Sequence, residues 1–190
     1  VDLARSGSLP TAVAAADHAL RHGLCTRDDL VREADAVPRR RRGRPQAALV
    51  VDLADGDSMS AGESLSRVQM FRLGVPRPRL RVRHEDAQGL IGIVDFDWDG
   101  AVGEFDGKVK YRASDGDSAP QVSEVLWREK KREDRLRARG RVARWTWEIA
   151  LDQERLGAVL AGQGVLPDPR ASWFDLGQRR RATGQRRRSR

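Results

Sequence analysis

Apolar residues three or four positions apart recur along the first third of the chain. This spacing predicts helices over about 10–22, 26–36 and 44–54. Pro10 suits the first turn of the first helix, and Thr26 suits the N-cap of the second. Together these elements predict a small helical segment whose apolar positions form a bundle core.

The pattern then changes to the alternation typical of β-strands. A helix expected over 61–73 precedes strands near 79–85, 90–98 and 101–110. Further elements follow in the order helix, strand, helix, at about 121–139, 142–146 and 147–160.

Charged and aromatic side chains of the later elements have two readings each. The arginines of the 121–139 helix, Arg132 and Arg135 among them, are expected mostly to solvate its outer face; holding a nucleic-acid backbone is their alternative. Trp145 and Trp147 alternate with polar residues, so we expect them to cover the sheet. Stacking on nucleic-acid bases is the alternative.

The segment from Leu90 to Tyr111 reads LIGIVDFDWDGAVGEFDGKVKY and predicts a β-hairpin. Asp99-Gly100 is a preferred two-residue hairpin loop, in which both residues would take positive φ, and this turn sets Asp95 opposite Glu104. Because side chains alternate across a strand, one face collects four acids and a lysine. That face holds Asp95, Asp97, Glu104, Asp106 and Lys108, and the other holds Val94, Phe96, Trp98, Ala101, Phe105 and Val109.

Carboxylates directly opposite one another in a sheet repel, so Asp95 and Glu104 require a counter-ion. Mg²⁺ or Mn²⁺ would supply it, since such ions bind one or two carboxylates together with water and substrate phosphates. Lys108 would orient the attacking water or offset developing charge. The alternative is a solvated polar face of an edge hairpin, neutralised by Lys108 and Lys110.

The spacing of Asp95, ten residues and then Asp106-Gly107-Lys108 resembles the PD-(D/E)xK nuclease pattern. The string VDFDWDGAVGEFDGKVKY resembles the actinobacterial branch of the very-short-patch-repair-like endonuclease domain family. AGESLSRVQMFRLGVPRP (61–78) resembles that family's first helix, with a Glu63-Ser64-x-x-Arg67 core, and VLWREKKREDRLRARGRVARWTWEIAL (125–151) resembles its closing helix and strand. The likeness covers residues 58–152. It implies an α/β fold, a restriction-endonuclease-like α/β/α core with a mixed central sheet, preceded by a small helical segment.

The resemblance also implies the site. It places metal-binding acids at Asp95 and Glu104, with Asp106 and Lys108 completing the motif and Glu63 reaching in from the preceding helix. The (D/E) position stays open between Glu104 and Asp106, and Asp95, Glu104 and Asp106 are all candidate metal ligands. Many relatives carry a histidine shortly after the Asp-Gly, where this chain has Lys110 and Tyr111. Glu63 has a second reading, because Ser60-x-x-Glu63 is a helix capping box.

Composition adds the domain organisation and the compartment. We expect a helical segment over 1–57, an endonuclease-like domain over 58–162 and a basic, disordered tail over 163–190. A single cysteine, Cys25, fits a reducing cytoplasm. No apolar run approaches the roughly 20 residues of a membrane helix.

The net charge of +8 suggests a nucleic-acid partner, but most of it lies at one end of the chain. Residues 178–190 contain seven arginines and no acid. Such a tail would bind nucleic acid through its phosphates or would only solubilise the protein. A second basic run, Arg39 to Arg44, either grips phosphate or is a solvated helix junction.

The first residues resemble the linker region of actinobacterial proteins related to abortive-infection type IV antitoxins. That likeness implies a winged-helix DNA-binding domain before residue 1 and a cognate toxin or regulatory partner. Two hypotheses follow. One is a Mg²⁺-dependent DNA endonuclease acting in repair or phage defence, and the other is a non-catalytic, antitoxin-like DNA-binding regulator.

Overall fold

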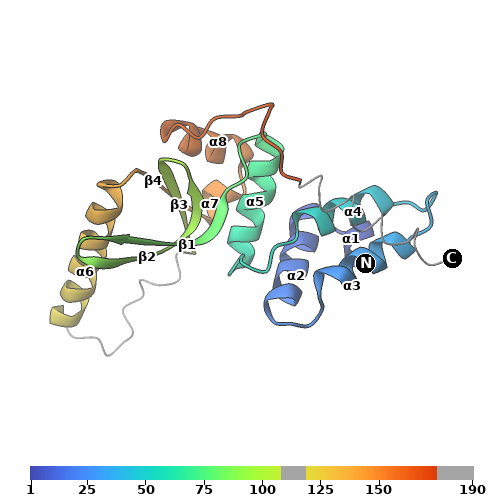
Figure 1. Cartoon of the computed structure of the whole chain (residues 1–190), viewed down its shortest axis with the longest axis horizontal. Coiled ribbons are helices and arrows are strands. Elements are labelled where there is room, and N and C mark those ends of the chain that lie inside the picture. The colour runs from blue at the N-terminus through green and yellow to red at the C-terminus, as the bar shows by residue number, and fades with distance from the viewer. Residues whose placement is uncertain (108–118, 175–190) are drawn as a thin grey trace.

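The computed structural model describes residues 1–107 and 119–174 of the chain. Its fold is mixed α/β: helices come first, then a four-stranded sheet, then further helices (Figure 1). The elements in order are α1 (Asp2–Ser6), α2 (Leu9–Arg21), α3 (Arg27–Ala36), α4 (Arg44–Leu53), α5 (Ala61–Leu73), β1 (Arg79–Asp86), β2 (Gly89–Trp98), β3 (Ala101–Asp106), α6 (Ala119–Arg137), β4 (Arg141–Thr146), α7 (Trp147–Ala150) and α8 (Gln153–Gly162).

The sheet has the strand order β1-β2-β3-β4 and is mixed. β1, β2 and β3 are antiparallel neighbours, whereas β4 runs parallel to β3. A parallel neighbour requires a crossover, and α6 provides it, so α6 covers one face of the sheet while α5 and α8 pack on the other (Figure 1). The expected α/β/α layering is therefore confirmed. The hairpin β2–β3 lies in the middle of the sheet, so the reading of it as an edge hairpin is wrong.

The final expected helix, over 147–160, is two helices. α7 ends at Ala150, and α8 begins after Asp152, whose Oδ1 accepts hydrogen bonds from the backbone amides of Glu154 and Arg155. An aspartate at this position caps a new helix rather than continuing the old one. The expected strand over 101–110 extends to Asp106 among the described residues.

The N-terminal helices and the sheet share one hydrophobic core. Val13 of α2 and Val50 of α4 belong to the same buried cluster as Val68 of α5 and Trp145 of β4. Trp145 is 1% exposed and its indole N–H donates to Ser66 Oγ at 2.8 Å, so its expected place on the sheet is confirmed. Trp147 is 39% exposed at the start of α7, and its ring meets that of Phe105 edge to face.

A buried ion pair reinforces this junction. Arg67 Nη1 lies 2.9 Å from Asp17 Oδ2, and both side chains are almost fully buried. Ser64 donates to the same carboxylate at 2.7 Å, and the Asp55 amide donates to its other oxygen. Two residues of the Glu63-Ser64-x-x-Arg67 core thus join α5 to α2.

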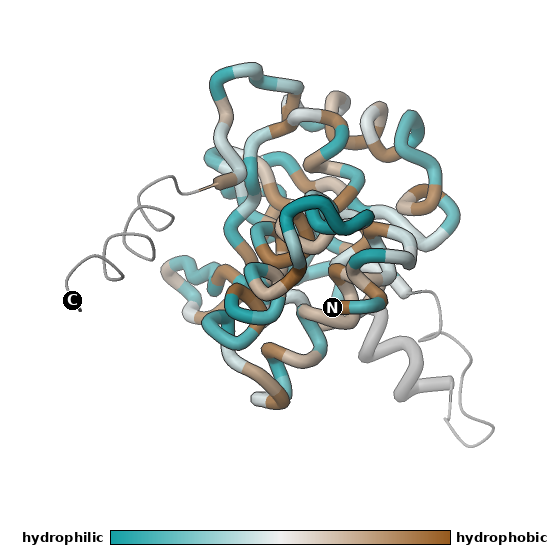
Figure 2. The backbone as a smooth tube through the Cα atoms, turned by 90° about the vertical axis from the view of Figure 1, so that its right-hand side faces the viewer, coloured by the Kyte–Doolittle hydropathy of each residue, from teal (hydrophilic) through white to brown (hydrophobic). Residues whose placement is uncertain are grey.

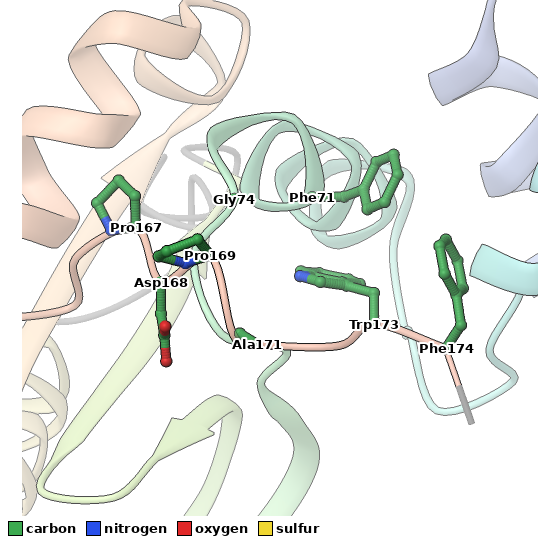
Figure 3. A pocket seen from close by; sticks show the side chains of 8 residues that line it. All are labelled: Phe71, Gly74, Pro167, Asp168, Pro169, Ala171, Trp173 and Phe174. Atoms are coloured by element: carbon green, nitrogen blue, oxygen red, sulfur yellow. The ribbon is translucent and has the colours of Figure 1, made fainter. Parts of the chain in front are cut away.

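The chain after α8 packs back on α5. Trp173 is 6% exposed, donates its indole N–H to the Val75 carbonyl at 2.8 Å and meets Phe71 edge to face. A cavity of about 390 Å³ lies between this segment and the end of α5, with Phe71, Trp173 and Phe174 on one side and Pro167 and Pro169 on the other (Figure 3). Residues 163–174, which the sequence assigns to the tail, are therefore folded. The expected disorder of 175–190 falls outside the described residues.

A membrane-spanning helix is not found in the described part of the chain, because none of its helices combines the necessary length and apolarity.

Candidate functional site

The hairpin has the register that its turn predicts as far as Phe96 and Gly103, but the expected pair of Asp95 and Glu104 is not among the paired residues. Trp98 pairs with Ala101, Asp97 with Val102, and Phe96 with Gly103. The turn differs in one detail, since Gly100 alone takes a positive φ, of 79°, and Asp99 does not. The one flexible residue is sufficient to close the loop without changing the pairing.

The sheet is distorted at Asp95. Arg81, which the β1–β2 register sets beside Asp95, has φ of 51°, the only positive value at a non-glycine position among the described residues. On the other side, the paired residues of β2 and β3 end at Phe96 and Gly103. Backbone in this region costs an arginine roughly 1–3 kcal/mol, and such strain concentrates at functional sites.

Because of this distortion, residues of β2 just before and just after Asp95 face opposite sides of the sheet, where strict alternation predicts the same side. Phe96 packs in the main core with Trp145, whereas Val94 belongs to a second cluster with Val102, Val142 and Leu136 of α6. The expectation that Val94 and Phe96 share one apolar face is therefore wrong. The alternation fails because the strand twists at Asp95, between them.

Asp95 is a half-buried carboxylate among other acids. Its Oδ2 accepts a hydrogen bond from the Phe105 amide at 2.9 Å, and it forms no ion pair within 1–107 and 119–174. Removal from water and then the charge of Glu63 raise the pKa of Asp95 to about 6. Glu104 adds to the rise, while the Phe105 amide and, more weakly, the charge of Arg132 oppose it. Such a carboxylate accepts a cation readily.

Glu63 reaches this region from the N-terminus of α5. The approach is close because Gly62 lies against the Phe105 ring, where an added Cβ would be 2.1 Å from a ring carbon. Glu63 Oε2 accepts from the Met59 amide at 2.7 Å and Oε1 from the Ser60 hydroxyl at 2.8 Å, while Ser60 Oγ accepts from the Glu63 amide. The capping role of Glu63 is confirmed, with the Met59 amide in place of the expected Ser60 amide. Its role as a metal ligand stays a prediction.

Glu104 has two arginines as its counter-ions. Arg144, its register neighbour on β4, lies 2.8 Å from Oε2, and Arg132 of α6 forms an ion pair with Oε1. Glu129 of α6 joins both guanidiniums, at 3.0 Å and 2.6 Å. The positive charge that the acids require is therefore supplied at Glu104 from within the fold.

Arg132 and Arg135 of α6 thus face the sheet, which corrects the expectation that they solvate an outer face. Arg132 crosses β2 directly above Gly92, where an added Cβ would lie 2.7 Å from its Nε. Arg135 forms an ion pair with Asp86 at the end of β1 and donates to the Gly89 carbonyl at 3.0 Å.

The other predicted residues are placed in part. Asp97 is 3% exposed, and its carboxylate is bonded to two residues of β1: Arg79 Nε lies 3.0 Å from Oδ1 and His84 Nε2 lies 2.7 Å from Oδ2. Asp97 is therefore not part of the acid cluster around Asp95. Asp106 ends β3 beside Thr146 of β4 and is partly exposed. Lys108 lies outside the described residues.

These donors fit Mg²⁺ or Mn²⁺ in kind, because both ions prefer carboxylate oxygens. Within the described residues, no group of three or more histidine, cysteine and acidic side chains is arranged to hold a metal ion. The arrangement suits an ion held by one or two carboxylates, with water and a phosphate supplying its other ligands.

Sequence reasoning missed Arg81, Arg132 and Arg144 as parts of this site. Gly92 within β2 was a usable signal, since glycine inside a strand often marks a close approach. The pairing of Glu104 with Arg144 had no signal, because it arises from the parallel register of two strands about 40 residues apart in sequence.

Comparison with known proteins shows distant similarity only. Over 98 residues the chain is 38% identical to the uncharacterized protein Rv2248 of Mycobacterium tuberculosis strain H37Rv and to the uncharacterized protein MT2308 of strain CDC 1551. The match covers 52% of this chain and 36% of each relative, so the chain spans about a third of their length. No protein-family model and no solved structure matches the chain.

Proposed function

We propose that the chain is a Mg²⁺- or Mn²⁺-dependent endonuclease of the very-short-patch-repair-like, PD-(D/E)xK type, hydrolysing phosphodiester bonds in DNA. The observation that carries the proposal is Asp95: a half-buried carboxylate without an ion-pair partner among the described residues, beside Glu63 and Glu104, at a strained break in the sheet. Apart from the Phe105 amide and the weaker influence of Arg132, a purely structural acid in this position lacks the compensation that buried charges require.

In this proposal Asp95 and either Glu104 or Asp106 hold the ion. A bound divalent ion lowers the pKa of water and offsets charge on the phosphate. Lys108 orients the attacking water.

Plasmid cleavage tests the proposal. The protein is incubated with supercoiled plasmid and Mg²⁺, Mn²⁺ or EDTA, beside the variants Asp95→Ala and Lys108→Ala. We expect nicking with either metal, none with EDTA, and a loss of at least a hundredfold in both variants. Asp134→Ala, an exposed acid on α6, is the matched control and should retain activity. Cleavage that survives both site substitutions would refute the site.

A second function has its own supporting observation. Arg132 and Arg144 already neutralise Glu104, and Glu63 is occupied as a helix cap. A nuclease-like domain that no longer binds metal would have such internal compensation. It would then be a scaffold within an antitoxin-like DNA-binding regulator, with a cognate toxin as its partner. No cleavage in any metal, together with no effect of Mn²⁺ on thermal stability, would favour this function.

Both functions place the chain on DNA and in the cytoplasm, where its one cysteine, Cys25, stays reduced. Because the chain spans only about a third of its mycobacterial relatives, the activity of a whole protein of that length is part of the same proposal.

A further inference from the structure

Four consecutive arginines project from the connection between α3 and α4, which we call the arginine loop (residues 38–43). Arg39, Arg40, Arg41 and Arg42 are all exposed. None of them forms an ion pair or a side-chain hydrogen bond within 1–107 and 119–174. This loop lies at the end of the molecule opposite α6 (Figure 1). Figure 2 looks onto that end, where a stretch of strongly hydrophilic residues, in teal, lies nearest the viewer.

The arginine loop has a defined conformation. Two successive turns form it, closed by the Arg41 amide on the Pro38 carbonyl at 2.9 Å and the Arg44 amide on the Arg41 carbonyl at 3.3 Å. The four charges are therefore concentrated in a small volume, where they repel one another. A chain that only needed solubility would gain as much from dispersed charges.

Helix α1 fixes the loop from behind. Arg5 Nε donates to the Arg42 carbonyl at 3.3 Å, and Gln46 Nε2 donates to the carbonyls of Ala4 and Gly7. Gly43 has φ of 81°, and an added Cβ there would lie 2.4 Å from the Arg5 carbonyl oxygen. A loop that is ordered before binding loses less conformational entropy when a ligand arrives.

From these observations we infer that the arginine loop is a binding site for the phosphate backbone of duplex DNA. Guanidinium groups bind phosphate oxygens through paired hydrogen bonds, and DNA presents about one negative charge per 1.7 Å of its axis. A lipid surface fits less well, because the loop has no aromatic or long aliphatic side chain to insert. The site lies on the helical segment, apart from Asp95, and it would bind DNA whether or not the hairpin acids cleave it.

Binding in EDTA tests this inference separately from cleavage. Fluorescence anisotropy measures the affinity of the 190-residue chain for a short labelled duplex across a range of salt concentrations. The loop variant replaces Arg39, Arg40, Arg41 and Arg42 with glutamine. We expect at least tenfold weaker binding at low salt and a salt slope smaller by up to about 3.6, since each of the four phosphate contacts contributes about 0.9.

A tail variant with Arg179, Arg180, Arg181 and Arg186 replaced by glutamine removes the same charge elsewhere. If the loop variant loses no more affinity than this control, the inference is wrong, because net charge alone then explains the loss. Thermal unfolding confirms that the loop variant is folded, which is expected since the replaced side chains are exposed. Loss of binding to anionic lipid vesicles, with duplex binding unchanged, would also overturn it.

Discussion

Asp17 and Asp95 are both acids withdrawn from water, but their surroundings compensate them differently. Asp17 has Arg67 at 2.9 Å, the Ser64 hydroxyl and the Asp55 amide around its carboxylate. Asp95 has one backbone amide, two neighbouring acids and the weaker influence of the Arg132 charge. Burial raises the pKa of both carboxyls; at Asp17 the charge of Arg67 opposes the rise, whereas at Asp95 the charge of Glu63 adds to it.

Asp95→Asn should stabilise the protein at neutral pH. The folded-state pKa of about 6 is above the usual unfolded value near 3.9. The folded state therefore binds more protons between these values, and the free energy of unfolding falls as pH rises through that window. Asparagine removes this loss, so we expect a gain of about 1–3 kcal/mol at pH above 6 and almost none near pH 4.

Urea unfolding of both proteins at several pH values measures this difference. The exposed acid Asp134, replaced by asparagine, is the control and should show no such trend. An equal gain at every pH would mean that the substitution acts through packing instead of charge.

Arg67→Met should cost about 3–5 kcal/mol, because it leaves Asp17 buried without its counter-ion. Arg72→Met on the same helix removes an exposed guanidinium and should cost less than about 1 kcal/mol. Denaturant titration measures both. Adding Asp17→Leu to Arg67→Met should recover part of the loss, and a further loss of stability would contradict the ion-pair explanation.

Among the elements, α6 determines the charge of the candidate site. Its arginines cross the sheet to Glu104 and Asp86, so the helix both covers the face and neutralises it. A divalent ion that used Glu104 would have to displace Arg132 or Arg144. Competition between guanidinium and metal for one carboxylate is therefore built into the proposed nuclease.

Arg132→Gln should strengthen Mn²⁺ binding, because it removes one competitor for Glu104. We expect the Mn²⁺ concentration at half-maximal thermal stabilisation to fall at least threefold. The matched control is Arg137→Gln on the same helix, whose ion pair is with Glu133. Unchanged or weaker Mn²⁺ binding in Arg132→Gln would exclude Glu104 as a ligand.

At the scale of the whole molecule, three distant parts of the chain complete one core. The N-terminal helices, the sheet and residues 163–174 all contribute to the cluster around α5. Small domains bury limited apolar area, so each part contributes measurably to stability. Removal of one part should therefore destabilise the whole.

Trp173→Ala tests the contribution of the C-terminal segment. The side chain is 6% exposed and its indole N–H is bonded, so its loss should cost about 3–5 kcal/mol. Trp127→Ala on α6, where the ring is 57% exposed, is the control with a much smaller effect. A small effect of Trp173→Ala would show that this segment is only loosely attached.

The sequence by itself determined the local elements and the hairpin, because both depend on short-range rules. Helical spacing, Ser60 and Thr26 as caps and the Asp99-Gly100 turn predicted most helix boundaries within two residues and the pairing of Trp98 with Ala101. The order of elements followed from the same patterns. Asp95, Glu104 and Glu63 were identified from their spacing and resemblance.

Tertiary structure alone decided how those acids are compensated. The Glu104–Arg144 pair depends on β4 joining β3 in parallel, and the Asp17–Arg67 pair depends on α2 docking on α5. The twist at Asp95 reversed the face of Val94, which strict alternation could not anticipate. Such contacts join residues far apart in sequence, and their energies depend on burial that exists only after the chain has folded.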